Sequence, residues 1–233
     1  MKFILVVFLF SMNLRENNSE GCYKNQSLLF DECMINFLPK VMDRLKDGKI
    51  LNDSNFLMEP LSMKNITVDS KNYLYTIKDI EIHGLVNDLK IEKFLVDWQN
   101  NIFYLDTYNP MVTIDGKCYY EKTDTEYKIN GQMCSIKLEN LHTSHVIAVI
   151  QGKAKASIKN WEISLSPVSV FTNEPEKFGK PILGFLSSMM FGSSISGEIY
   201  EEIQQSLEDS LSRKFIKLAN EILETPLESL SNL

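Results

Sequence analysis

The sequence predicts an α+β protein in which a long, highly curved antiparallel sheet wraps around a long C-terminal helix. The middle of the 233-residue chain alternates apolar and polar residues, as half-buried strands do. That alternation slips by one residue at several places, and such slips are typical of β-bulges, which bend and twist a sheet. The C-terminal part then carries an apolar residue at about every fourth position, as one face of a helix does.

The chain begins with Met1 and Lys2, followed by the apolar run FILVVFLF at residues 3–10. A positive charge before an apolar stretch of this length is typical of a signal peptide, and the stretch is too short to span a bilayer. We therefore interpret residues 1–19 as a signal peptide with a short tail, and residues 20–233 as a single domain. A buried N-terminal strand is the alternative. No later segment approaches the ~20 continuous apolar residues of a membrane helix, so we expect a secreted, extracellular protein.

Composition predicts a large core and an acidic surface. The chain is 44% apolar and has a net charge of -7, which disfavours nucleic acid and anionic membranes as partners. Four N-x-S/T sequons are present. On a secretory route we expect glycosylation at Asn25, Asn52 and Asn65.

Four cysteines in a secreted chain predict two disulfides. The alternating runs at residues 111–121 and 127–138 predict a hairpin that places Cys118 opposite Cys134 on its apolar face. That face carries Val112, Ile114, Tyr120, Ile136 and Leu138. By elimination, Cys22 pairs with Cys33 and ties the N-terminal tail to the first helix. A zinc site is the alternative, but no CxxC or close Cys/His spacing supports it.

Three slips in the strand pattern predict the curvature. They lie between Ile77 and Ile80, between Ile91 and Phe94, and between Ile158 and Trp161. Without a bulge, each slip would turn the following side chains to the other face of the sheet. The alternative is three unrelated irregularities in an ordinary sandwich.

Two amphipathic helices flank the strands. Residues 30–45 place their apolar side chains on one face, with a kink expected at Pro39 and an end at Gly48. Residues 196–224 form a longer helix of about 43 Å, whose apolar stripe needs a trough such as a bent sheet supplies. A coiled-coil dimer is the alternative, but the spacing is mostly four and not the three and four of heptads.

The N-terminal half carries motifs that resemble the takeout and juvenile hormone binding protein family of secreted insect proteins. This family belongs to the tubular lipid-binding superfamily, which also includes the mite group 7 allergens. The resemblance falls on Cys22, Cys33, Pro39, Gly48, Glu59, Pro60, Leu61, Ile82, Gly84 and Leu85. It implies a single lipid-binding domain with an apolar tunnel between sheet and C-terminal helix, capped by the N-terminal helix. A Cys118–Cys134 bridge is not expected of takeout members, which leaves the subfamily and the ligand open.

A carrier of a small hydrophobic ligand follows from that resemblance: a terpenoid, a juvenile hormone-like molecule or a fatty acyl chain. Burial of apolar surface would stabilise such a complex by ~25 cal/mol per Å², and no cofactor is expected. The candidate tunnel lining is Met34, Phe37, Leu38, Met42, Phe94, Val96, Trp98, Val112, Ile114, Phe185, Met189 and Ile199. For each of these residues, ordinary core packing is the alternative. The rival function is a secreted recognition protein on the same fold that binds a protein partner or a lipid surface.

No catalytic or metal site is predicted. The GSSISG stretch is not a G-x-S-x-G elbow, and Walker, HExxH and dinucleotide motifs are absent from the sequence. Three histidines are present, and His142 and His145 lie three apart on an expected strand, so they should face opposite sides of the sheet. We interpret all three histidines as surface or structural residues.

Overall fold

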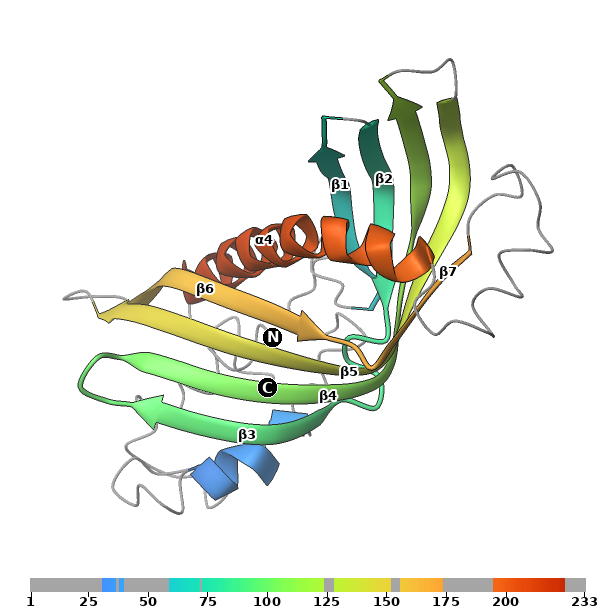
Figure 1. Cartoon of the computed structure of the whole chain (residues 1–233). Helices are drawn as coiled ribbons and strands as arrows, with labels where there is room; N and C mark the ends of the chain where they lie inside the picture. The colour runs from blue at the N-terminus through green and yellow to red at the C-terminus, as the bar shows by residue number, and fades with distance from the viewer. Residues whose placement is uncertain are drawn as a thin grey trace.

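The computed structural model describes residues 31–36, 38–39, 59–71, 73–123, 128–151, 156–173 and 195–224. They form one antiparallel sheet, one long helix and the helical residues 31–36 and 38–39 (Figure 1). The elements are β1 (Leu61–Asp69), β2 (Tyr73–His83), β3 (Lys90–Asp97), β4 (Ile102–Lys122), β5 (Lys128–Gln151), β6 (Ala156–Ser166), β7 (Ser169–Asn173) and α4 (Ile195–Glu224). The predicted α+β class is confirmed.

Two very long strands, β4 and β5, form the middle of the sheet and run through both of its halves. In one half, β3 pairs with residues 102–108 of β4, and β6 pairs with residues 142–151 of β5. In the other half, β2 pairs with the later part of β4, β1 pairs with β2, and β7 pairs with residues 135–139 of β5. We call these the β3–β6 half and the β1–β7 half.

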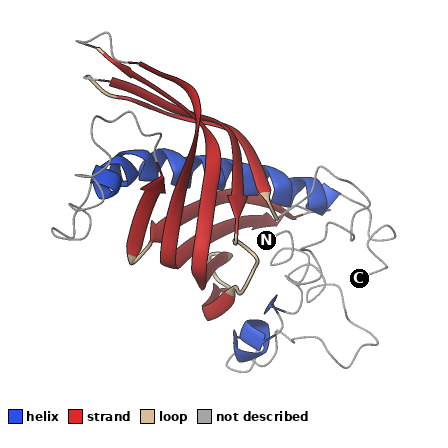
Figure 2. Cartoon of the chain, turned by 90° about the vertical axis from the view of Figure 1, so that its right-hand side faces the viewer, coloured by secondary structure: helices blue, strands red, loops and turns tan. Residues whose placement is uncertain are grey.

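The sheet bends where the two halves meet. On β4 the buried residues are 103, 105, 107 and 109, and then 112, 114, 116 and 118. On β5 the same change of phase falls between Leu138 and Leu141. Pro110 has no N–H for the ladder, and Asn140 has a φ of +50°, so the regular pattern is interrupted on both strands at the same level. Figure 2 shows the resulting curvature, with α4 lying along the sheet.

All three predicted bulges are confirmed as register shifts. They fall between Lys78 and Glu81 on β2, between Ile91 and Lys93 on β3, and opposite Ala148 and Val149, where Lys159 of β6 is the extra residue. A fourth bulge was not predicted from the sequence. Its extra residue is Gly131 on β5, which has a φ of +70° and stands between the partners of Cys118 and Tyr119.

The Cys118–Cys134 disulfide is present, but the predicted register of its hairpin is wrong. Cys118 pairs with Gln132, and Cys134 pairs with Gly116, so the two cysteines are diagonal neighbours and not opposite each other. The bulge at Gly131 and the length of the turn set this register. Because the offset is two residues, both side chains keep the same buried face, and their Cα atoms lie 5.9 Å apart.

Helix α4 lies on the inner side of the sheet, within one residue of the predicted bounds. Its apolar stripe is buried at Ile203, Leu207, Leu211, Phe215 and Leu218. Polar side chains also join the helix to β6. Asn220 accepts a hydrogen bond from the backbone N of Ile158 at 2.7 Å, and Glu208 accepts one from Leu165 N at 2.8 Å. The sheet therefore covers the face that a coiled-coil partner would need.

At the N-terminal side, Met34 and Leu38 are buried in the main core. Several predictions lie outside the described residues: the signal peptide, the Cys22–Cys33 bridge, the end of the first helix at Gly48, and the glycan sites Asn25 and Asn52. Asn65 is exposed on β1. Within the described part of the chain, no helix combines the length and the hydropathy needed to cross a membrane.

Candidate functional site

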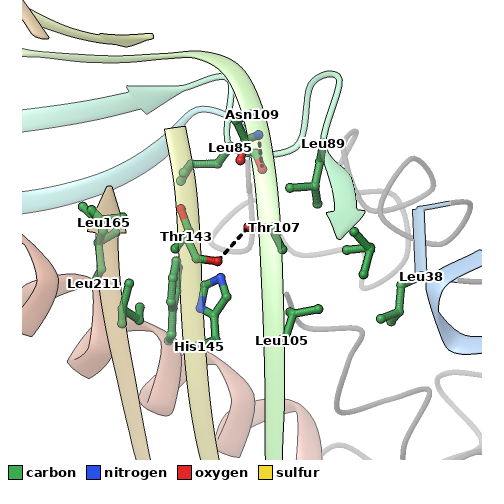
Figure 3. Close-up of a pocket in the computed structure, with 13 residues that line it drawn as sticks. Leu38, Leu85, Leu89, Leu105, Thr107, Asn109, Thr143, His145, Leu165 and Leu211 are labelled. Carbon is green, nitrogen blue, oxygen red and sulfur yellow. Dashed lines mark hydrogen bonds between the residues drawn. The ribbon is translucent and has the colours of Figure 1, made fainter. Parts of the chain in front are cut away.

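A small cavity of about 50 Å³, which is part of a larger hollow of about 580 Å³ that includes space open to solvent, lies against the β3–β6 half, beside the bend of the sheet (Figure 3). Nine of its lining residues are apolar: Leu38, Leu85, Leu89, Ile91, Leu105, Ile163, Leu165, Leu211 and Phe215. Four are polar: Thr107, Asn109, Thr143 and His145. The mainly apolar lining is typical of small-molecule sites.

Each wall of the cavity comes from a different element. The sheet provides the inner face of β3, β4, β5 and β6, where alternate side chains point the same way. Leu211 and Phe215 come from consecutive turns of α4, since residues four apart share a helix face. Leu38 comes from the N-terminal helical residues, and the predicted closing of one end of the apolar space by this segment stays a prediction.

The segment between β2 and β3 forms the wall that carries Leu85 and Leu89, and hydrogen bonds from both sides hold its backbone. The carboxylate of Glu59 accepts from Gly84 N at 2.7 Å and from Val86 N at 3.4 Å. From the other side, Nδ2 of Asn109 donates to the carbonyl oxygens of Gly84 and Leu85, at 2.8 and 3.3 Å. The Glu59 and Gly84 positions of the sequence motif thus meet in space and position a cavity wall.

The polar lining residues lie in a row along the two central strands. Thr107 and Thr143 are direct partners across β4 and β5, and the Thr107 hydroxyl lies 3.5 Å from the Thr143 carbonyl oxygen, to which it can donate. Asn109 and His145 lie two residues further along their own strands, in opposite directions. Figure 3 shows this group on the inner face, beside Leu105 and Leu211.

His145 is the titratable residue in the lining, and it is only 6% exposed. Its Nδ1 accepts a hydrogen bond from Nε1 of Trp161 at 3.3 Å, and the two rings meet edge to face. Burial lowers the pKa of this imidazole to about 3, because the apolar surroundings disfavour the charged form. The ring is therefore neutral at physiological pH. His142 is exposed on the other face, as predicted.

Among the residues that the structure describes, no charged side chain lines the cavity. The described residues also contain no group of three or more His, Cys, Asp or Glu side chains that could hold a metal ion. The arrangement can therefore accommodate an apolar body and offer a few hydrogen bonds at one place.

Of the twelve side chains predicted to line the tunnel, Leu38 lines this cavity. Met34, Phe94, Val112 and Ile114 are buried in the core cluster. Val96 and Trp98 are partly buried against that cluster. Phe37, Met42, Phe185 and Met189 lie outside the described residues, as does the side chain of Ile199. The predicted lining as a whole stays a prediction.

Sequence reasoning missed the polar group, although a signal was present. Thr107 and Asn109 follow Phe103 and Leu105 at every second position, and Thr143 and His145 lie between Leu141 and Ile147 in the same way. Polar side chains in the buried phase of a strand mark either an internal hydrogen bond or a site.

One solved structure has a similar architecture. The structure is similar to the crystal structure of Epiphyas postvittana Takeout 1, with a TM-score of 0.60 and 14% identity, over 85% of this chain and 94% of that chain. A solved lipopolysaccharide binding protein gives a TM-score of 0.36 and 9% identity, over 80% of this chain and 39% of that chain. A search of curated protein sequences returns no match. The sequence model described as haemolymph juvenile hormone binding protein matches residues 3–228. Because this match spans nearly the whole chain, the protein belongs to the haemolymph juvenile hormone binding protein family.

Proposed function

We propose that this protein is a secreted carrier that binds a small hydrophobic molecule, such as a terpenoid, a juvenile hormone-like compound or a fatty acyl chain, in the cavity beside the bend of the sheet. The observation that carries the proposal is the cavity itself, in which nine of thirteen lining residues are apolar. Family membership supports it, since the family is described by its binding of a hormone and not by a reaction. The proposal includes no catalytic step.

Binding would be driven by removal of apolar surface from water, at ~25 cal/mol per Å². The leucine side chains of the β2–β3 segment and the aromatic ring of Phe215 on α4 contribute to that surface. The proposed lining also includes the predicted residues outside the described part of the chain, which would extend the apolar space. Secretion is proposed from the apolar run at residues 3–10.

Native mass spectrometry of the protein secreted from insect cells, followed by extraction and identification of any bound compound, tests the proposal directly. A hydrophobic compound at one per chain is expected. A protein that is empty, and that also fails to bind a fluorescent fatty-acid probe, would contradict the carrier function. That result would favour the alternative, a recognition protein that uses the same fold to bind a protein partner.

A matched pair of variants locates the site. Leu89→Trp places a larger side chain in the cavity, and we expect it to weaken probe binding roughly tenfold or more, because the ligand must compete for filled space. Leu95→Trp makes the same change on the outer face of β3, where Leu95 is 41% exposed. It should bind the probe as the unmodified protein does. If the two substitutions change probe affinity equally, the probe does not bind in this cavity.

A further inference from the structure

His145 leaves one ring nitrogen without a partner in the described structure. Its Nδ1 is occupied, because it accepts the hydrogen bond from Trp161. A neutral imidazole that accepts at Nδ1 carries its proton on Nε2. The two nitrogens of the ring point in widely different directions, so Nε2–H points away from Trp161. Among the described residues, none accepts a hydrogen bond from it, although the side chain is 94% buried and lines the cavity.

The neighbouring polar side chains enlarge this donor site. Thr143 lies two residues from His145 on the same face of β5, and both line the cavity. The Thr143 backbone carbonyl oxygen accepts a hydrogen bond from the hydroxyl of Thr107. The Thr143 hydroxyl itself forms no hydrogen bond with another described residue. One N–H donor and one hydroxyl are therefore available at neighbouring positions of β5.

The charges of the described lining residues disfavour an anion at this point. A buried carboxylate needs a positive partner or several donors, and none of the described lining residues is Lys or Arg. His145 could become that partner only by gaining a proton, which burial opposes by lowering its pKa. The buried carboxylate of Glu208 bonds to the backbone of Leu165, another lining residue, and so adds negative charge from the side of α4.

We propose that His145 is a specificity-determining residue: its Nε2–H donates a hydrogen bond to a neutral acceptor oxygen, that of a ketone, ester or ether, on an otherwise apolar ligand. The cavity thereby selects uncharged molecules over the ionised carboxylate of a free fatty acid. This inference rests on the proposed function, because it names the polar end of the ligand that the same cavity would hold.

Three molecules of similar length separate the effect of the acceptor oxygen from the effect of charge: methyl oleate is a neutral ester, oleate is a carboxylate and 1-octadecene is a hydrocarbon. Each is measured at pH 8 by displacement of a fluorescent apolar probe from the full-length secreted protein. We expect the ester to bind at least tenfold more tightly than the carboxylate. We also expect it to bind roughly two- to tenfold more tightly than the hydrocarbon, the range for one added hydrogen bond.

Variants at two positions show whether His145 is the donor. Trp161→Phe is the control, since it removes the Trp N–H and leaves the imidazole in place. In the double variant His145→Phe with Trp161→Phe, no buried N–H is orphaned, and the preference for ester over hydrocarbon should disappear relative to that control. His145→Gln keeps an amide donor at the position and should restore part of the preference. The ratio of ester affinity to hydrocarbon affinity reports the hydrogen bond, because a change in packing alone would alter the affinities of both ligands by a similar factor.

The outcomes are distinct. Binding of the carboxylate as tightly as the ester, or an ester-to-hydrocarbon ratio that is unchanged in the double variant, would overturn the inference and leave the carrier function intact. Failure of all three molecules, together with the fluorescent probe, would overturn both.

Discussion

The carboxylate of Glu59 and the backbone N–H of Gly84 are joined by a hydrogen bond of 2.7 Å across 25 residues of sequence. The same carboxylate also accepts a hydrogen bond from Val86 N. On the other side of the segment between β2 and β3, the side-chain amide of Asn109 donates hydrogen bonds to the carbonyl oxygens of Gly84 and Leu85. The cavity wall made by Leu85 and Leu89 therefore depends on two side chains that do not themselves form the apolar surface.

We expect Glu59→Ala to lower the free energy of unfolding by about 1–3 kcal/mol, because it leaves two backbone N–H groups without their acceptor. Urea denaturation measures this change. Displacement of a fluorescent probe should also show weaker binding in the folded protein, since Leu85 and Leu89 lose their support. Glu81→Ala is the control on the neighbouring strand, where the side chain is exposed, and should change stability by less than about 0.5 kcal/mol. Similar losses in both variants would refute a special role for Glu59.

Gly84→Ala should be more harmful than Gly131→Ala, although both glycines have positive φ. A Cβ at residue 84 would lie 2.3 Å from the carbonyl oxygen of Met111, which is part of the sheet backbone and has little freedom to move. At residue 131 the nearest atom is the hydroxyl of Tyr119 at 3.1 Å, at the end of a side chain that can shift. We expect a loss of about 1–2 kcal/mol at residue 131, from the left-handed backbone alone, and a larger loss at residue 84. Thermal unfolding measures the loss of stability in the two variants. A larger loss in Gly131→Ala than in Gly84→Ala would contradict this prediction.

Replacing Cys118 and Cys134 together by alanine should lower the free energy of unfolding by about 3 kcal/mol, the loop-closure value for a disulfide that spans roughly this many residues. Binding of a fluorescent probe by the folded variant should stay unchanged, because the bridge lies in the β1–β7 half and neither cysteine lines the cavity. Urea midpoints and probe affinity are measured on the same sample. A loss of affinity that exceeds the loss of folded protein would show that the two halves are coupled.

Acid should destabilise the protein through His145. In the folded state the pKa of this imidazole is about 3, whereas in the unfolded chain it is ~6.5. The unfolded state therefore binds the proton first. The contribution of His145 to stability is complete above about pH 6.5 and is lost as the pH falls from there towards 3, with a limiting slope of ~1.4 kcal/mol per pH unit. Unfolding free energies of the unmodified protein and of His145→Gln should draw together over this range, and parallel curves would show that His145 does not titrate differently in the two states.

The curvature of the sheet could be predicted from sequence because a strand has a period of two. Any one-residue interruption, such as that between Ile77 and Ile80, is visible in the order of apolar residues. The bulge at Gly131 left no such mark, because it lies next to a turn among polar residues. The register of the hairpin depends on that bulge, which is why Cys118 was placed opposite Cys134 and not diagonal to it.

The site was harder to predict than the fold. Alternation identifies the inner face of a strand, so Val112 and Ile114 were correctly expected to be buried, but it does not indicate which part of that face borders an empty space. That choice depends on where the sheet bends and where α4 crosses it. His145 was interpreted as a structural residue because a single histidine on a strand has no local pattern that distinguishes a core partner of Trp161 from a ligand donor.

The continuity of β4 and β5 has a consequence for how this protein opens. Since each strand contributes backbone hydrogen bonds to both halves of the sheet, the opening of one half is coupled to the other half through the same two strands. The amides of these two strands are expected to exchange with deuterium together, as one cooperative unit and at the slowest rate in the chain. Any passage of a molecule into or out of the interior would then proceed by displacement of the segments packed around this unit, while the unit itself stays closed.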